Sequence, residues 1–132
     1  SDRRPDSDAR TRGPHIHVAE YVRLQSMGQV CGFMLLSMRI FGDARKAEGF
    51  VAGGIRSKWW SKQFWTYTVW GSREEMEDFV KRWPHTEAVE RVQTVAAPGS
   101  CYVKWTSDQP IDWADALARL ERPTRYFVAP PF

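Results

Sequence analysis

A histidine at a break between two helical patterns is the residue of this 132-residue chain that is most suited to chemistry. His85 directly follows Pro84, and proline disfavours helical geometry at the residue before it, so we expect the histidine at a kink where its side chain can point into a pocket. Imidazole transfers protons near neutral pH and also ligates iron. We therefore expect His85 to act as a general acid or base. The alternative is a local hydrogen bond at the helix break.

The remaining histidines and the cysteines offer weaker chemistry. His15 and His17 lie two residues apart on one strand face and could chelate a metal, but they lack a third ligand at a defined spacing. Cys31 and Cys101 form no C-x-x-C motif and have no neighbouring histidine in the sequence. We predict no metal site and no redox pair, which favours a reduced, cytoplasmic protein.

Aromatic residues make up 14% of the chain and include seven tryptophans, a load that indicates dense packing or ligand binding. Trp70 and Tyr67 fall on opposite faces if the strand alternates strictly, so only one of them can face the helices. Methionine adapts to irregular ligands, and tryptophan in a hairpin loop favours a substrate rim or a dimer contact. The candidate substrate-binding residues are Trp70, Tyr67, Met34, Met38, Phe79, Trp83, Trp59 and Trp60, with plain core packing as the alternative for Trp70.

Arginine supplies the candidate cations. Arg39, Arg56 and Arg73 could each steady a phenolate or carboxylate, because a guanidinium stays charged when it is partly desolvated. The simpler interpretation of each is solvated surface charge.

Composition excludes several partners. The net charge is +3, but basic and acidic residues alternate and no recognition motif accompanies them, so we expect no nucleic-acid binding. No apolar run reaches the roughly 18 residues that span a bilayer, and the N-terminus does not resemble a signal peptide. A glycine-rich nucleotide motif and a flavin signature are both absent, so we expect no cofactor.

The order of the elements predicts the fold. Residues 1–14 mix Arg with Asp, have no large apolar side chain and predict a flexible tail, and residues 15–132 form a single domain. Hydrophobic periodicity, caps and turn residues give strand 15–24, helix 28–49, strand 50–58 and strand 64–70 in the first half. Gly53 and Gly54 indicate a bulge or a close backbone approach in the second of these strands.

The second half repeats the pattern. It contains a helix opened by Ser72 and Glu75 as a capping box, a second helical segment after Pro84, strand 101–107, a short helix capped by Asp112, and a last strand at 125–132. The result is an α+β, ferredoxin-like split βαβ sandwich. Right-handed crossovers put both crossover helices on one face of the sheet and leave the other face bare. A second copy covering that face would give a homodimer.

The segment of residues 64–89 resembles the dimeric α/β-barrel monooxygenase superfamily, which includes antibiotic biosynthesis monooxygenases and relatives of spheroidene monooxygenase. The residues that carry the resemblance are Trp70, Ser72, Glu75, Phe79, Pro84, His85 and Ala88. The match is close over about a fifth of the chain and extends to most of it only in the order of elements. The resemblance implies a pocket for hydrophobic, often polycyclic, substrates between the helices and the sheet.

Members of this superfamily differ in chemistry. Some resemble cofactor-free oxygenases of anthrone-like polyketides, some bind heme, and some are cyclases or lack catalysis. The heme-degrading branch has Trp where this chain has Phe79 and a heme-ligating His where it has Val89, so that activity is not expected. The spheroidene branch shares the Pro-His pair, which keeps heme binding through His85 as an alternative.

The sequence therefore predicts a small oxygenase of secondary metabolism. It would act on a hydrophobic, polycyclic aromatic, polyketide-like substrate with His85 as the general base. A cofactor-free cyclase or isomerase, a heme-binding monooxygenase and a non-catalytic ligand-binding module remain alternatives. The predicted partners are the small-molecule substrate and a second copy of the chain, with no nucleic acid and no membrane.

Overall fold

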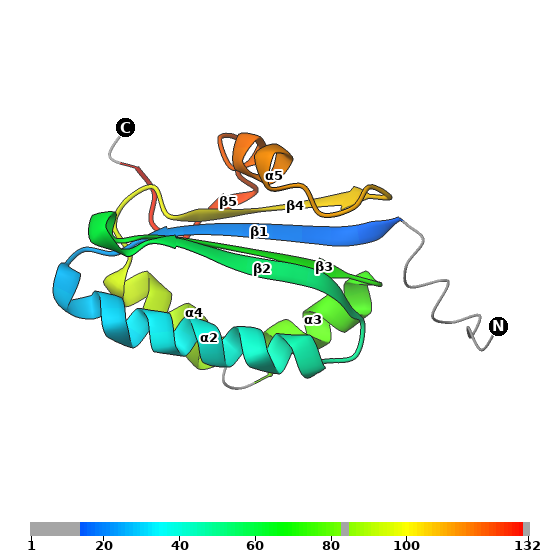
Figure 1. The fold of residues 1–132 in the computed structure, drawn as a ribbon, viewed down its shortest axis with the longest axis horizontal. Coiled ribbons are helices and arrows are strands. Elements are labelled where there is room, and N and C mark those ends of the chain that lie inside the picture. The colour runs from blue at the N-terminus through cyan, green and yellow to red at the C-terminus, as the bar shows by residue number, and fades with distance from the viewer. Residues whose placement is uncertain (1–13, 83–84, 131–132) are drawn as a thin grey trace.

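A five-stranded antiparallel sheet forms the centre of the computed structural model, which describes residues 14–82 and 85–130 without the side chains of residues 85–89. The strand order is β2-β3-β1-β4-β5 (Figure 1). The strands are β1 (His15–Arg23), β2 (Phe50–Lys58), β3 (Gln63–Trp70), β4 (Cys101–Ser107) and β5 (Arg125–Tyr126). The first four have the order of the ferredoxin-like repeat, which confirms the predicted α+β fold class.

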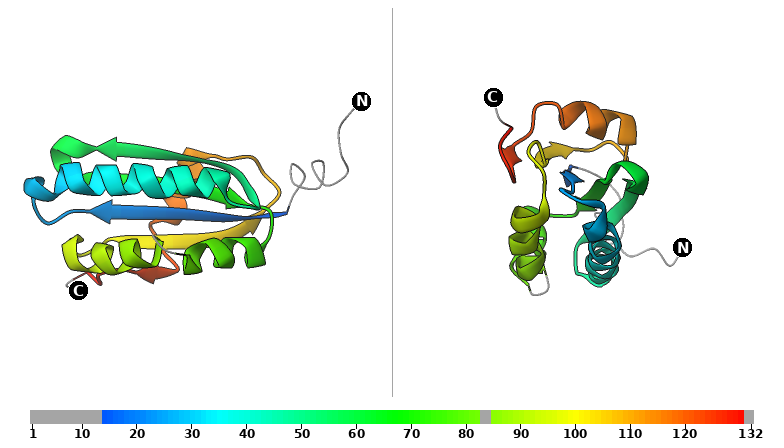
Figure 2. Two further views of the ribbon diagram at one scale, coloured as in Figure 1. Left: turned by 90° about the horizontal axis from the view of Figure 1, so that it is seen from below. Right: turned by 90° about the vertical axis from the view of Figure 1, so that its left-hand side faces the viewer.

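Three helices cover one face of the sheet. They are α2 (Val30–Lys46), α3 (Arg73–Lys81) and α4 (His85–Val95), and α3 and α4 lie end to end beside α2 (Figure 2). Two short 3₁₀ turns, η1 (Met27–Gln29) and η2 (Trp59–Ser61), lie at one end of the sheet (Figure 1). The crossover helices therefore lie on a single face, as right-handed connections require.

Local capping explains where two of the helices begin. The Ser72 hydroxyl oxygen accepts a hydrogen bond from the backbone N–H of Glu75 at 3.2 Å, and this hydroxyl also donates to the Glu75 carboxylate at 3.1 Å. The Asp112 carboxylate accepts from the backbone N–H of Asp115 at 3.2 Å and starts α5 (Trp113–Arg119). Both predicted N-caps are confirmed, because each side chain satisfies a donor that the helix leaves free. The return bond of the predicted capping box differs, since the Glu75 carboxylate bonds the Ser72 hydroxyl.

The helix α5 corrects one sequence expectation. It packs on the sheet face opposite the other three helices (Figure 2), so this face is not bare as predicted. Ala116 of α5 is fully buried, and it lies in one apolar cluster with Ala19, Tyr67 and Val103 of the sheet. The sequence order shows α5 but not the face to which it returns, because no crossover rule applies to a helix after the last core strand.

β2 carries the predicted irregularity at a slightly different position. The register between β2 and β3 shifts between Phe50 and Ala52, and not at the glycines. A Cβ atom on Gly53 would lie 2.7 Å from the backbone oxygen of Tyr67. Gly53 is therefore the predicted close backbone approach, whereas the bulge precedes it.

The ends of the chain fall partly outside this description. The predicted flexible tail, residues 1–14, lies outside the described residues except for Pro14, and β1 starts directly after it. The last strand is shorter than predicted, because pairing to β4 covers only Arg125 and Tyr126. Within the described residues, no helix combines the length and hydropathy needed to cross a bilayer.

Candidate active site

A cavity of about 710 Å³ lies between the sheet and its three-helix layer. Its walls come from α2, α3, α4 and the chain around β5, and its floor comes from β1, β3 and β4. The floor residues are Val18, Glu20, Val22, Phe64, Thr66, Thr68, Tyr102 and Lys104, and Trp70 at the end of β3 joins the wall by stacking on Phe79. Ligand pockets usually measure about 300–1,000 Å³, so the cavity has room for a polycyclic molecule.

Trp70 forms a rigid part of this cavity. Its indole ring stacks on Phe79 at a centroid distance of 5.2 Å and meets Phe50 edge-on at 5.7 Å. The indole N–H donates to the hydroxyl oxygen of Thr68 at 3.0 Å. Because its polar atom is bonded and its faces are packed, Trp70 is held in one orientation. The structure thus brings Trp70 and Phe79 together in the cavity wall, where both were expected.

The floor also carries polar groups that were not among the predicted site residues. Glu20, Thr66 and Lys104 line the cavity from β1, β3 and β4, and the Lys104 ammonium lies 5.8 Å from the centre of the Tyr102 ring. The hydroxyls of this largely apolar cavity, and the ammonium of Lys104, an exposed residue that borders it, can stabilise negative charge that develops on a ligand. Strict alternation along β1 and β4 was the signal that could have identified Glu20 and Lys104, since both share a face with known apolar floor residues.

Neither predicted methionine lines the cavity. Met34 packs against the apolar cluster of Val30 and Phe33, and Met38 is 61% exposed. The cavity face of α2 repeats at Phe33, Leu36, Ser37, Ile40 and Ala44, the spacing of a helix with 3.6 residues per turn. Met38 falls between these positions and faces away.

The hairpin tryptophans lie apart from the cavity. Trp59 and Trp60 are 52% and 62% exposed on η2, and their rings meet edge-on at 5.8 Å. They line neither of the cavities described here. Their predicted contact with a substrate or with a second copy stays a prediction.

His85 and Trp83 cannot be placed in the cavity from the structure. Trp83 and the His85 side chain lie outside the described residues. The backbone of α4 begins at His85, and Val92 and Gln93 of this helix line the cavity. The role of His85 therefore stays a prediction.

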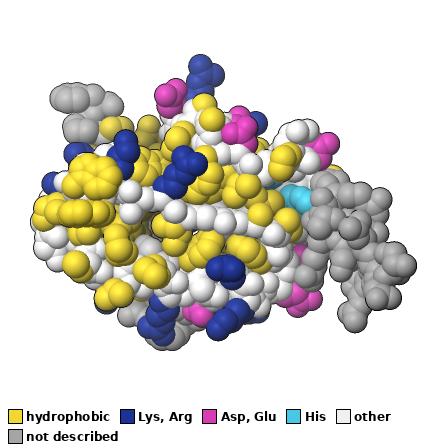
Figure 3. All heavy atoms as spheres, viewed as in Figure 1, with side chains coloured by type: hydrophobic (Ala, Val, Ile, Leu, Met, Phe, Trp, Pro, Cys, Tyr) yellow, Lys and Arg dark blue, Asp and Glu magenta, His cyan; other side chains and the backbone are white. Residues whose placement is uncertain are grey.

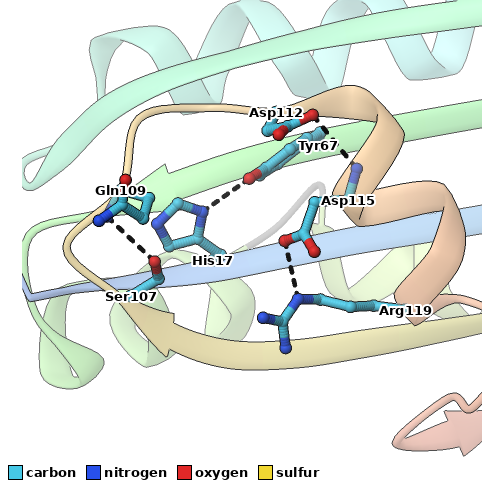
Figure 4. A network of polar contacts seen from close by, with 7 residues as sticks. All are labelled: His17, Tyr67, Ser107, Gln109, Asp112, Asp115 and Arg119. Carbon is cyan, nitrogen blue, oxygen red and sulfur yellow. Dashed lines mark hydrogen bonds and ion pairs between the residues drawn. The ribbon is translucent and has the colours of Figure 1, made fainter.

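Tyr67 lies on the opposite face of the sheet from Trp70. Strict alternation along the strand predicts this arrangement, in which only one of the two residues faces the helices. It lines a second cavity of about 620 Å³, beneath α5 and the loop that precedes it. The lining includes His17, Arg56, Trp105, Trp113 and Arg119 (Figure 4 shows His17, Tyr67 and Arg119 of this group). The two cavities share no lining residue and are separated by the sheet. Tyr67 therefore cannot contact a ligand in the helix-side cavity.

His17 and Tyr67 form a buried polar pair. Their Nδ1 and Oη atoms lie 2.7 Å apart, and both residues are 1% exposed. Burial lowers the pKa of His17 below its usual 6.5, and the backbone of Ser107 opposes this effect. Burial also raises the pKa of the Tyr67 hydroxyl. At neutral pH the pair consequently consists of a neutral imidazole and a protonated phenol.

The three candidate arginines lie in different places. Arg56 places its guanidinium 4.5 Å from the centre of the Trp113 ring in the second cavity. Arg73 pairs with Glu77 at 3.0 Å on the exposed side of α3, and Arg39 is exposed on α2. Neither of these two lines a cavity described here. Among the described side chains, those of residues 14–82 and 90–130, no three His, Cys, Asp or Glu are grouped to hold a metal ion.

Comparison with known proteins establishes the class of fold. No family model and no curated protein matches the sequence. Solved structures match over 71–76% of this chain and 94–99% of their own chains. The chain thus has the ferredoxin-like fold of the antibiotic biosynthesis monooxygenase structures.

Three of these structures illustrate the range. SnoaB from Streptomyces nogalater, a cofactor-independent oxygenase, aligns with a TM-score of 0.60 at 11% identity, covering 75% of this chain and 98% of its own. An antibiotic biosynthesis monooxygenase aligns with a TM-score of 0.60 at 10% identity, over 73% and 99% of the two chains. A conserved protein from Methanosarcina mazei Go1 aligns with a TM-score of 0.63 at 12% identity, over 73% and 94%.

Proposed function

We propose that this protein is a cofactor-free oxygenase that takes a hydrophobic, polycyclic aromatic substrate into the helix-side cavity. The observation that carries the proposal is this cavity of about 710 Å³, with Trp70 and Phe79 fixed in its wall and polar groups in its floor. The fold is also that of SnoaB, a cofactor-independent oxygenase. The substrate class agrees with the cavity, since flat aromatic rings bury well against aromatic side chains.

The proposed oxygenation begins with loss of a proton from the substrate. A base removes a proton from an activated CH₂ group, the resulting carbanion gives an electron to O₂, and the two radicals join as a peroxide. Loss of water then leaves a carbonyl, so that the CH₂ group and O₂ become C=O and H₂O. The protein supplies the base, a water-poor cavity and donors for the oxyanion.

The described residues support two of these roles. Lys104 and the threonine hydroxyls of the floor can donate to the oxyanion, and the packed wall around Trp70 positions the rings. For the base we propose His85, at the start of a helix that bounds the cavity. This assignment rests on the sequence, where His85 is the only histidine outside the first strand.

The test uses anthrone as the probe, a three-ring compound with an activated CH₂ group. We expect saturable quenching of tryptophan fluorescence on binding, followed by O₂ consumption and anthraquinone formation in air but not under nitrogen. Turnover of another product under nitrogen would indicate a cyclase or isomerase instead. Absence of any saturable binding would remove the proposal.

Variants locate the reaction. His85→Ala should lower turnover about 10²- to 10⁴-fold with a smaller change in KM, as for loss of a general base. Trp70→Phe should mainly raise KM, because it removes part of the stacking wall. The matched control is Trp65→Phe, since Trp65 lies on the opposite face of β3 from Trp70 and lines neither cavity. Unchanged turnover in His85→Ala would contradict the base assignment but leave the cavity assignment standing.

A further inference from the structure

The cavity beneath α5 contains a buried polar atom without a partner. The Nε2 atom of His17 makes no hydrogen bond of good geometry, although its ring is 1% exposed, its Nδ1 atom is bonded to Tyr67 and the Ser107 backbone lies near the ring. A buried polar group that lacks a hydrogen bond is costly, so such groups usually have a partner. If the Tyr67 hydroxyl donates to Nδ1, Nε2 carries a proton and needs an acceptor. A ligand in the cavity can supply one.

Aromatic rings surround this atom. Trp105 stacks on the His17 ring at 5.2 Å with 26° between the planes. Tyr67 contacts Trp105 at 5.5 Å and meets Trp113 edge-on at 5.6 Å. A cavity bordered by indole and phenol rings favours a flat aromatic ligand over an aliphatic one.

Two guanidinium groups lie against the same rings. Arg119 lies 4.8 Å from the centre of Trp105 and is neutralised by Asp115 at 2.8 Å (Figure 4). Arg56 lies 4.5 Å from the centre of Trp113 and forms no ion pair within the described part of the chain. Its charge is therefore open to a carboxylate, which binds a guanidinium through two parallel hydrogen bonds.

Gly54 makes room for this arrangement. A Cβ atom at this position would lie 3.3 Å from the Trp113 ring, so the glycine lets the indole settle on β2 next to Arg56. Trp113 lies on the helix that follows the four-stranded core, and α5 thus completes the cavity.

We propose that the cavity beneath α5 is a second binding site, for a small aromatic carboxylate. The ring lies against Trp105 and Trp113, the carboxylate pairs with Arg56, and one of its oxygens accepts a hydrogen bond from His17 Nε2. This site is separate from the proposed oxygenase site, because the sheet lies between them and no lining residue is shared.

The test titrates the full chain with 2-naphthoate while the imidazole resonances of His17 are followed by ¹H–¹⁵N NMR. We expect saturable binding with a shift of the His17 Nε2 signal. Arg56→Met should weaken the binding about 10-fold or more, the usual effect of losing a charge-assisted pair. The matched control Arg73→Met removes an exposed arginine on the other side of the sheet and should leave the affinity unchanged.

Two further ligands test whether the site requires a carboxylate and whether it is distinct from the helix-side cavity. The neutral analogue 2-naphthamide should bind at least about 10-fold more weakly than 2-naphthoate. Anthrone should not displace 2-naphthoate, because it is expected in the other cavity. Equal affinity for the amide, equal affinity in Arg56→Met, displacement by anthrone or absence of saturable binding would each overturn the proposal. Arg56 is exposed, so its substitution tests the site without endangering the fold.

Discussion

His17 is a histidine whose protonation the fold opposes. Burial is the largest cause of its lowered pKa, and the positive charge of Arg119 and the neighbouring His15 act in the same direction. The Ser107 backbone and Asp115 favour the protonated form but are outweighed. Tyr67 and Arg56 also border the ring's cavity. The folded protein therefore holds His17 neutral at a pH where an unfolded chain would bind a proton.

This predicts a pH dependence of stability. Above the unfolded pKa of about 6.5 both states are neutral at this residue, and its protonation contributes nothing. As the pH falls below about 6.5, only the unfolded state binds a proton, so the free energy of unfolding decreases until the lowered folded pKa is reached. Each unit of pKa difference corresponds to about 1.4 kcal/mol. Urea unfolding between pH 8 and pH 5 should show this loss.

The variant His17→Gln isolates the contribution. It removes the titrating group, so its free energy of unfolding should fall less than that of the wild type over the same pH range. Identical slopes for the two proteins would show that His17 is not held neutral. The comparison uses slopes, and therefore tolerates a lower absolute stability of the variant.

The sequence predicts which face of the sheet a side chain points to, but not which side chain on a neighbouring strand it bonds. Alternation along β1 and β3 correctly separates Trp70 from Tyr67. His17 and Tyr67 are 50 positions apart in the sequence. Their bond depends on the β1–β3 register, which pairs His17 with Val69 and Ala19 with Tyr67. Hydrophobic periodicity does not encode that register, so the sequence alone indicates His17 only as half of a metal-binding pair.

Among the elements, β2 shows how backbone contact determines what a strand tolerates. Gly53 faces the helix layer, and an added Cβ would meet the Tyr67 backbone oxygen at 2.7 Å and the Phe41 ring at 3.1 Å. Gly54 faces α5, where an added Cβ would meet the Trp113 ring at 3.3 Å. The first neighbour is fixed by strand pairing, whereas the second is a side chain that can shift by a few tenths of an ångström.

The different neighbours of Gly53 and Gly54 predict that an alanine is tolerated at position 54 but not at position 53. Gly53→Ala should destabilise the protein by about 1–3 kcal/mol, the usual cost of overpacking, because relief requires moving paired backbone. Gly54→Ala should change stability by less than about 1 kcal/mol, since the loss of unfolded-state entropy offsets a small shift of Trp113. The midpoints of urea unfolding measure both. An equal or larger loss in Gly54→Ala would contradict the assignment of the faces.

Most elements followed from local signals, and the exceptions have a physical cause. Ser72 and Asp112 fix helix starts through bonds to residues three positions on, so a capping pattern finds them. The shift in β2 next to Val51 depends on the partner strand, and the glycines that signal close approach do not locate it. The candidate cavity floor was also missed in part, because Glu20 and Lys104 look like surface charges until β1 and β4 are paired.

At the scale of the whole molecule, α5 divides the sheet face that a partner would cover. One half lies under α5, around Tyr67 and Trp113. The other half carries Tyr21 and Trp65, in contact at 5.4 Å, and continues to the exposed tryptophans of η2. Figure 3 shows hydrophobic side chains gathered at this end of the molecule. A second copy would therefore meet the end of the sheet that α5 leaves open, and not the whole face.

The last prediction is a homodimer formed through this open end of the sheet. Sedimentation equilibrium at micromolar concentration should give about twice the chain mass of 15.3 kDa. Trp60→Asp should shift the equilibrium toward monomer, because it places a charge among apolar side chains that the dimer would bury. Leu35→Asp is the matched control, since Leu35 is 69% exposed on α2 in the helix layer and should leave the dimer intact. A wild-type monomer would refute the dimer, and dissociation by Leu35→Asp alone would move its interface to the helices.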